Sequence, residues 1–335
     1  MKRGIIQSRG LGDIVIALPI ARYYADQGDE IYWPVCREFY SSVVSAVPWV
    51  NWIAIETDRE GRFFLDTPLQ ELKTAGCDLE ECLYLYQFLS SRPDLTDPEM
   101  YNILKFDQYK YARSAVPFRL KWELASCIVR DPAREQALRS VLGIEEGERY
   151  ALTHFKGSSF EAQLDVNFLD PAVRIISIDS NLTPDSQLFD WCGVLEGAEA
   201  FIGIDSVYAN LVDSLKLDID LYWIRRSQWD LTPVLGSAWT IIPTNLAITE
   251  PTRIDPAALT QKMRAAAPKS DGSLQSYVPF ETDKKGMPTN FMHAVKQGGS
   301  SGNLQSSPAA APANSSPVPK MNNALDLYKQ LGVKY

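Results

Sequence analysis

The stretch that decides the fold is SRGLGDIVIALPIARYYADQG, residues 8–28, which follows the short apolar run Gly4-Ile5-Ile6. The apolar spacing of IVIALPIARYYADQ (14–27) predicts a helix that ends at Gly28. Residues 4–8 predict a strand, and a kink or a late start of the helix is expected at Pro19. The turn between strand and helix holds two glycines and an acid: Gly10, Gly12 and Asp13.

Beyond this stretch the chain alternates short apolar runs with helical segments. Strands are expected at 30–35, 51–56, 150–155, 173–178, 200–205, 220–225 and 239–243. Helical segments are expected at 37–47, 130–144, 186–198 and 206–217, and 78–89 is open to either structure. Strands that alternate with helices are typical of parallel sheets. The sequence therefore predicts the α/β class, with two successive nucleotide-binding-type units.

The domain organisation follows from changes of composition along the chain. We expect a first unit over 1–128 and a second over 129–267. Residues 268–320 are rich in Ser, Pro, Gly, Ala and Asn, so they cannot bury enough apolar surface to offset their ordering entropy. We expect a disordered linker there. The last segment, MNNALDLYKQLGVKY (321–335), regains leucines. It is interpreted either as a short helical motif that docks on the protein itself or on a protein partner, or as a frayed tail.

Charge and cysteine content exclude several classes of function. The chain has 33 basic and 42 acidic residues and a net charge of -9, which disfavours non-specific binding to nucleic acid or anionic lipid. Its five cysteines lack the spacing of a metal site and are expected to be reduced thiols. The start of the chain does not resemble a signal peptide, and no apolar run reaches the ~20 residues of a membrane span. We expect a soluble, cytoplasmic protein with no metal site.

The glycine turn has two interpretations. A loop between the carboxyl end of a strand and a helix is where open α/β sheets bind ligands, and glycines let the backbone approach them. The pattern is neither GxGxxG nor a P-loop, because Asp13 follows Gly12. Asp13 is therefore either a catalytic carboxylate or the cap of the helix, and these roles do not exclude each other.

Four segments resemble glycosyltransferase family 9, the lipopolysaccharide heptosyltransferases and their relatives. The turn SRGLGDIVIALP is similar to the start of these proteins, and AVPWVNWIAIE to their next strand. DPAREQALRSVLGI resembles the helix between their domains, and GVLEGAEAFIGIDSVYANLVDSL resembles their segment ending in Asp-Ser-Gly-x-x-His-x-Ala. The resemblance extends over roughly residues 3 to 245.

The resemblance implies a GT-B fold, in which two Rossmann-like domains face a cleft. The first domain would bind the acceptor and the second the nucleotide sugar, in a metal-independent, inverting reaction. Asp13 would be the base that deprotonates the acceptor hydroxyl. Arg9, Gly10 and Gly12 would lie on the acceptor side. The donor diphosphate would be bound by two loops of the second domain: Lys156, Gly157, Ser158 and Ser159, and Asp205, Ser206 and Asn210.

Each donor loop also has an ordinary structural interpretation, and the family pattern is not complete. In this interpretation, Asp205 and Ser206 cap a helix and bind no ligand. Gly-Ser-Ser is likewise a common turn composition. Val207 stands where the family has glycine, Asn210 where it has histidine, and Gln163 where it has lysine. His154 is interpreted as a donor-site residue or as a hydrogen-bonded core histidine.

These observations predict a glycosyltransferase that moves a sugar from a nucleotide sugar to the hydroxyl of an acceptor, with a glycan favoured. No cofactor is expected beyond the nucleotide sugar itself. Two alternatives remain open. One is a non-catalytic binding or assembly protein that keeps the fold, and the other is a nucleotide-sugar epimerase or phosphorylase.

Overall fold

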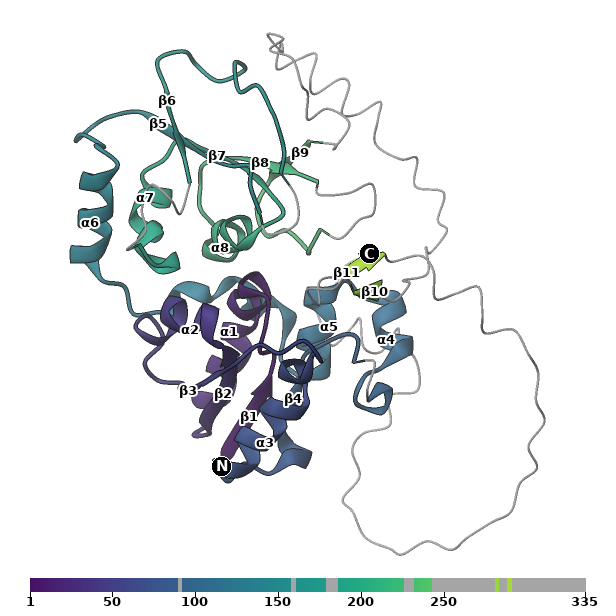
Figure 1. Ribbon diagram of the computed structural model, residues 1–335. Helices are drawn as coiled ribbons and strands as arrows, with labels where there is room; N and C mark the ends of the chain where they lie inside the picture. The colour runs from purple at the N-terminus through teal and green to yellow at the C-terminus, as the bar shows by residue number, and fades with distance from the viewer. Residues whose placement is uncertain are drawn as a thin grey trace, which may run out of the picture.

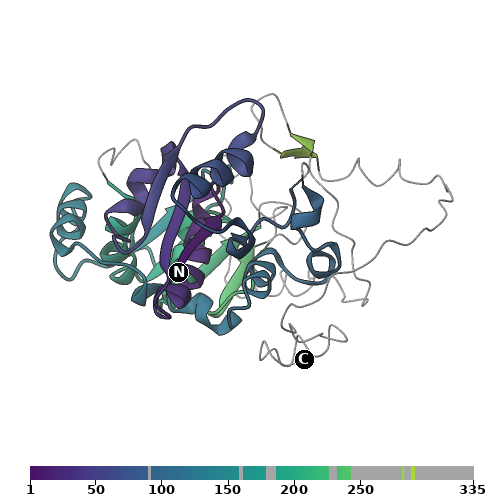
Figure 2. The same ribbon diagram turned by 90° about the horizontal axis from the view of Figure 1, so that it is seen from below.

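The computed structural model describes residues 1–89, 92–157, 161–178, 186–225 and 232–242, and two short strands, Glu281–Thr282 (β10) and Pro288–Asn290 (β11). The predicted linker 268–320 otherwise lies outside the described residues, and so does the motif 321–335. Figure 1 shows two α/β units, the second drawn above the first. Seen from below in Figure 2, the first unit lies in front of the second.

The first unit contains a four-stranded parallel sheet in the order β3-β2-β1-β4. Its strands are β1 (Lys2–Ile6), β2 (Glu30–Cys36), β3 (Asn51–Ile55) and β4 (Leu83–Tyr84). Its α-helices are α1 (Leu11–Ala25), α2 (Arg37–Val44), α3 (Asp66–Thr74), α4 (Pro98–Ile103) and α5 (Phe106–Arg113).

The second unit contains a five-stranded parallel sheet in the order β6-β5-β7-β8-β9. Its strands are β5 (Tyr150–His154), β6 (Arg174–Ser177), β7 (Ala200–Ile204), β8 (Asp220–Ile224) and β9 (Trp239–Ile242). Its α-helices are α6 (Pro132–Val141), α7 (Cys192–Glu196) and α8 (Val207–Leu215). Short 3₁₀ turns connect the elements of both units: Arg62–Phe64, Leu79–Glu81, Pro93–Leu95, Phe118–Trp122, Leu124–Ser126 and Leu188–Trp191.

Most predicted elements are present, with changes at their ends. The first strand is shifted to Lys2–Ile6, and α1 begins at Leu11, so the late start that we expected at Pro19 is wrong. The ambiguous stretch 78–89 forms a 3₁₀ turn and the short edge strand β4. The helix expected at 186–198 is a 3₁₀ turn followed by the five-residue α7.

Helix α1 lies between its own sheet and the second unit. Every residue from Ile14 to Ala21 is buried, Pro19 included. A helix that is apolar on all sides is stable only when it is covered on all sides. Here α1 packs against α5 and the 3₁₀ turn Phe118–Trp122, and it contacts α8 of the second unit (Figure 1).

A buried ionic cluster joins the two units. The Nζ atom of Lys121 lies 2.9 Å from Oδ2 of Asp107, on α5, and 3.4 Å from Oδ2 of Asp213, on α8. The side chains of all three residues are at most 1% exposed. The backbone N–H of Val234 donates to Asp107 and that of Gly236 to Asp213. Because buried charges are costly unless paired, this cluster fixes α8 against the first unit.

Candidate active site

The turn after β1 takes the shape that its first glycine allows. Gly10 has φ +83°, a left-handed conformation that favours glycine, and it is the N-cap of α1. A Cβ atom at Gly10 would lie 2.5 Å from Oδ2 of Asp13. Residue 10 therefore has to be glycine both for the backbone angle and to leave room for the carboxylate.

Asp13 lies in the first turn of α1 and is paired with a lysine from elsewhere in the chain. Its Oδ1 is 3.0 Å from Nζ of Lys110, and its side chain is 37% exposed. The N-cap of the helix is Gly10, so the interpretation of Asp13 as the cap is wrong. A carboxylate in the first turn is still favoured by the helix dipole.

Lys110 is a site residue that sequence reasoning missed. It lies on α5 and its side chain is only 3% exposed. Its ammonium also donates to Oε1 of Gln7, at 2.6 Å, and to the carbonyl of Leu85, at 3.2 Å. Lys110 is almost 100 residues from the glycine turn. The only local signal is its place between two tyrosines, Tyr109 and Tyr111, which are both buried.

Arg9 closes the other side of the turn. Its backbone N–H donates to the hydroxyl of Tyr86, at 2.9 Å, and its guanidinium lies 5.1 Å from the centre of the Phe63 ring. The Tyr86 hydroxyl also shares a hydrogen bond with Ser8, at 3.0 Å, and burial raises the pKa of this tyrosine. These contacts fix the backbone that leads into Gly10.

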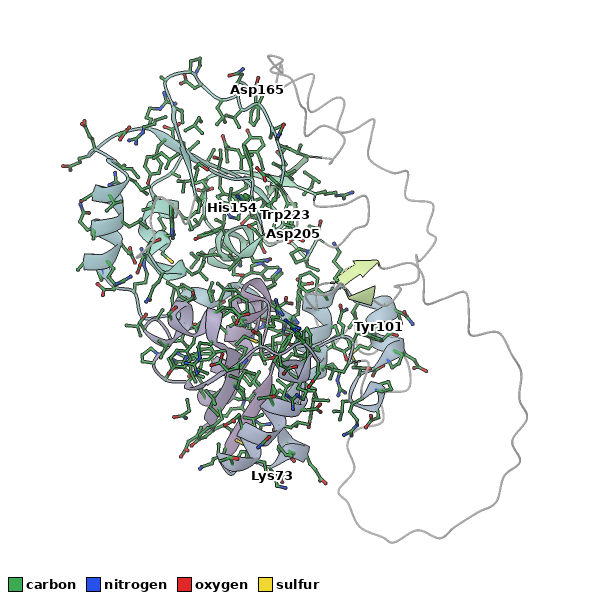
Figure 3. All side chains as sticks on the ribbon, viewed as in Figure 1. Lys73, Tyr101, His154, Asp165, Asp205 and Trp223 are labelled. Atoms are coloured by element: carbon green, nitrogen blue, oxygen red, sulfur yellow. The ribbon has the colours of Figure 1, made fainter. Side chains whose placement is uncertain are left out.

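The donor loops predicted in the second unit begin side by side. Strands β5 and β7 are neighbours, with His154 opposite Gly203, so the loops that follow them share the carboxyl edge of the sheet. Lys156 is exposed and Gly157 is partly exposed, whereas Ser158 and Ser159 lie outside the described residues. Figure 3 labels His154, the last residue of β5, and Asp205, the residue after β7.

Ser206 caps α8, as one interpretation of the sequence proposed. Its hydroxyl accepts from the backbone N–H of Ala209, at 3.4 Å, and it lies 3.0 Å from Nδ1 of His154. His154 is 8% exposed, and burial lowers its pKa to about 4. It is therefore a buried, hydrogen-bonded histidine, and it is neutral at pH 7.

The depressed pKa of His154 makes stability depend on pH. Between about pH 6.5 and pH 4 the unfolded chain protonates this residue while the folded chain does not, so stability is lost as the pH falls. We expect His154→Gln, which can keep the bond to Ser206, to remove about 2 kcal/mol of the destabilisation between pH 7 and pH 5. Urea unfolding at both pH values measures it. Parallel losses in the two proteins would contradict this assignment.

The two units touch at the glycine turn itself. A Cβ atom on Gly12 would lie 2.9 Å from Nδ2 of Asn210 and 3.6 Å from Cα of Val207. Asn210 is 6% exposed, and its Nδ2 donates to the carbonyl of Ser206. Its Oδ1 is buried and has no hydrogen-bond partner among the residues that the structure describes. The start of α8 therefore lies directly against the turn that carries Asp13.

This close approach predicts the effect of a methyl group at residue 12. Overpacking typically costs about 1–3 kcal/mol. The higher helix propensity of alanine offsets less than about 1 kcal/mol of this cost, because residue 12 is only the second residue of α1. We expect Gly12→Ala to lose about 1 kcal/mol of unfolding free energy in urea. The loss should shrink when Asn210→Ala removes the nearest atom. Strictly additive effects of the two substitutions would show that these residues do not press on each other.

Comparisons with known proteins agree on the fold. No family model matches the sequence, and no curated protein matches it significantly. ADP-heptose LPS heptosyltransferase II of E. coli matches with a TM-score of 0.51 and 13% identity, over 79% of this chain and 98% of that one. The chain has the fold of a heptosyltransferase. This confirms the predicted GT-B fold and, at the level of the fold, the resemblance to family 9.

Two further structures match this chain with lower TM-scores. A family 9 glycosyl transferase from Veillonella parvula has a TM-score of 0.47 and 12% identity, over 82% of this chain and 94% of that one. The E. coli heptosyltransferase WaaC with ADP has a TM-score of 0.44 and 16% identity, over 80% of this chain and the whole of that one.

Among the residues that the structure describes, none of the helices combines the length and the apolar character that a membrane span requires.

Proposed function

We propose that this protein is a glycosyltransferase, which moves a sugar from a nucleotide diphosphate sugar to the hydroxyl of an acceptor. The observation that carries this proposal is the placement of Asp13. Its side chain is partly exposed, and one of its oxygens is paired with Lys110. The turn that carries it belongs to the first unit of a heptosyltransferase fold and lies against the start of α8 in the second unit. The domain limits 1–128 and 129–267 belong to the same proposal.

Asp13 would act as the general base. As the acceptor oxygen attacks the anomeric carbon, its proton passes to the carboxylate, a carbon–oxygen bond forms, and the bond to the diphosphate breaks. A carboxylate within hydrogen-bond reach of the hydroxyl supports such a step. Attack from the side opposite the leaving group inverts the anomeric centre. Arg9, Gly10 and Gly12 would line the acceptor side.

The leaving diphosphate would be bound at the start of α8 and the loop after β5. Helix N-termini attract anions, because their N–H groups and dipole point outwards. Ser206 and Asp205 lie at this end of the helix, and the exposed Lys156 and Gly157 follow the neighbouring strand. Lys156, which is exposed, would supply positive charge to the diphosphate. We propose that Ser158 and Ser159, which follow Gly157 in the sequence, complete this site without a metal ion.

The matched E. coli structure is named as an ADP-heptose enzyme, so an ADP-linked sugar is the first donor to examine. We propose a glycan as the acceptor, no cofactor beyond the nucleotide sugar, a cytoplasmic location, and a protein partner for residues 321–335.

A non-catalytic binding protein is the second candidate, and one observation favours it. Asn210 stands where the family that the sequence resembles has histidine, and here it is buried against Gly12. Its amide nitrogen already donates to Ser206. A side chain held in this way offers little to a diphosphate, so donor binding has to be measured directly.

The test is a thermal-shift screen of ADP, UDP and GDP and of their sugars, with Mg²⁺ and with EDTA. A ligand that binds only the folded state raises the melting temperature. One diphosphate that raises it equally in both conditions supports the proposal, and Ser206→Ala should weaken the shift while Ser126→Ala, in an exposed turn, should not. No shift with any compound would favour the binding protein.

A further inference from the structure

We propose that Lys110 is a positioning residue, which holds Asp13 by Oδ1 and leaves Oδ2 as the atom that accepts the proton of the acceptor hydroxyl. This inference rests on the proposed function. It goes further because it gives the two carboxylate oxygens different roles: Oδ1 binds a buried lysine, and Oδ2 accepts the proton.

The surroundings of Lys110 support a fixed ammonium group. Three oxygens lie around Nζ: Oδ1 of Asp13 at 3.0 Å, Oε1 of Gln7 at 2.6 Å and the carbonyl of Leu85 at 3.2 Å. They come from α1, from the residue after β1 and from the residue after β4, so the lysine is held from three sides. An ammonium has three N–H groups. Each can be matched by one of these oxygens.

Gln7 is fixed in its turn. Its side-chain amide donates to the carbonyl of Arg9, at 2.8 Å, and the backbone carbonyl of Gln7 accepts from the indole N–H of Trp33, at 3.0 Å. Gln7 is 1% exposed. The chain of contacts from Trp33 through Gln7 to Lys110 therefore ends on Oδ1 of Asp13, and it sets the direction of the carboxylate.

The second oxygen has a different environment. Oδ2 lies 2.5 Å from the position that a Cβ atom of residue 10 would take. With glycine there, no side chain of residue 10 covers Oδ2, and the Asp13 side chain keeps 37% of its surface exposed. Lys110 lies on the buried side of the carboxylate, so the proton of an acceptor would be taken by Oδ2.

The experiment uses the full chain and the slow hydrolysis of ADP-heptose, or of the nucleotide sugar that gives the largest thermal shift, with water in the place of the acceptor. Lys110→Ala should lower kcat by about 10²-fold, because an ångström of misplacement costs that much, and should change KM less than twofold. Lys73→Ala, an exposed lysine on α3, is the matched control. Propylammonium chloride should restore part of kcat in Lys110→Ala, and tetramethylammonium chloride, which has no N–H group, should not.

Gly10→Ala provides a second route if Lys110→Ala does not fold. Its methyl group would press on Oδ2, so kcat should fall while ADP still shifts the melting temperature. The inference is overturned if Lys110→Ala keeps kcat, if only KM rises, or if propylammonium restores nothing. Asp13→Asn separates the two proposals. If it is inactive while Lys110→Ala and Gly10→Ala are active, only the positioning role fails; if it is fully active, the base itself is wrong.

Discussion

Asp13→Asn is expected to lower turnover by about 10²–10⁴-fold, the usual range for the loss of a general base. Asparagine keeps the shape of the side chain and an oxygen for Lys110, but its amide cannot accept a proton at neutral pH. The donor would bind mainly at the second unit, so the thermal shift with ADP should persist. Diphosphate release from the nucleotide sugar measures the first effect, and the thermal-shift titration measures the second.

The control for this prediction lies on the same helix. Asp26 is the C-cap of α1, 59% exposed and paired with Arg22, so Asp26→Asn removes an aspartate from the other end of α1 without touching the turn. It should leave turnover unchanged. Asp13→Asn also leaves the buried ammonium of Lys110 without its counter-charge and should melt earlier, so both variants are assayed well below their melting temperatures. Equal turnover in the two variants would remove Asp13 from the mechanism.

Lys121→Met is expected to cost about 3–5 kcal/mol of unfolding free energy, the range for removing one partner of a buried ion pair. Methionine fills much the same volume, but it leaves the carboxylates of Asp107 and Asp213 buried without the cation between them. Without the lysine, the two buried carboxylates repel each other strongly, because little water screens them. Urea unfolding at pH 7 gives the change in free energy.

The matched control is Lys216→Met. Lys216 is an exposed lysine at the end of α8, next to the same cluster, and its ammonium lies 5.6 Å from the centre of the Trp122 ring. Its loss should change stability by less than about 1 kcal/mol. If Lys121→Met unfolds at the same urea concentration as Lys216→Met, then the ionic cluster does not hold the units together.

The sequence predicted the two sheets well, because their strands are short apolar runs that depend little on distant parts of the chain. It also singled out Asp13, since a glycine turn between a strand and a helix is a local pattern. It did not predict α3, α4 and α5, whose polar residues follow no clear helical period. Pro19 misled the interpretation, because burial on all sides stabilises α1 in spite of the missing hydrogen bond.

The contacts of the site could not be predicted. Lys110 and Lys121 are buried because each meets carboxylates that are far away in the sequence, and nothing next to them in the chain specifies those partners. Asp107 and Lys110 lie one turn apart on α5. Helix α5, which sequence reasoning missed, therefore carries both a member of the ionic cluster, Asp107, and the lysine that is paired with Asp13.

The burial of α1 has a consequence for how this protein could be changed. Eight consecutive residues after the glycine turn have no surface on which a substitution is free, so the residue that would do the chemistry lies on an element with almost no mutational tolerance. The loop after β3 is mostly exposed around residues 56–61 and carries no such constraint. Substitutions are therefore better tolerated in loops such as this one, and libraries built in α1 would mostly yield proteins that do not fold.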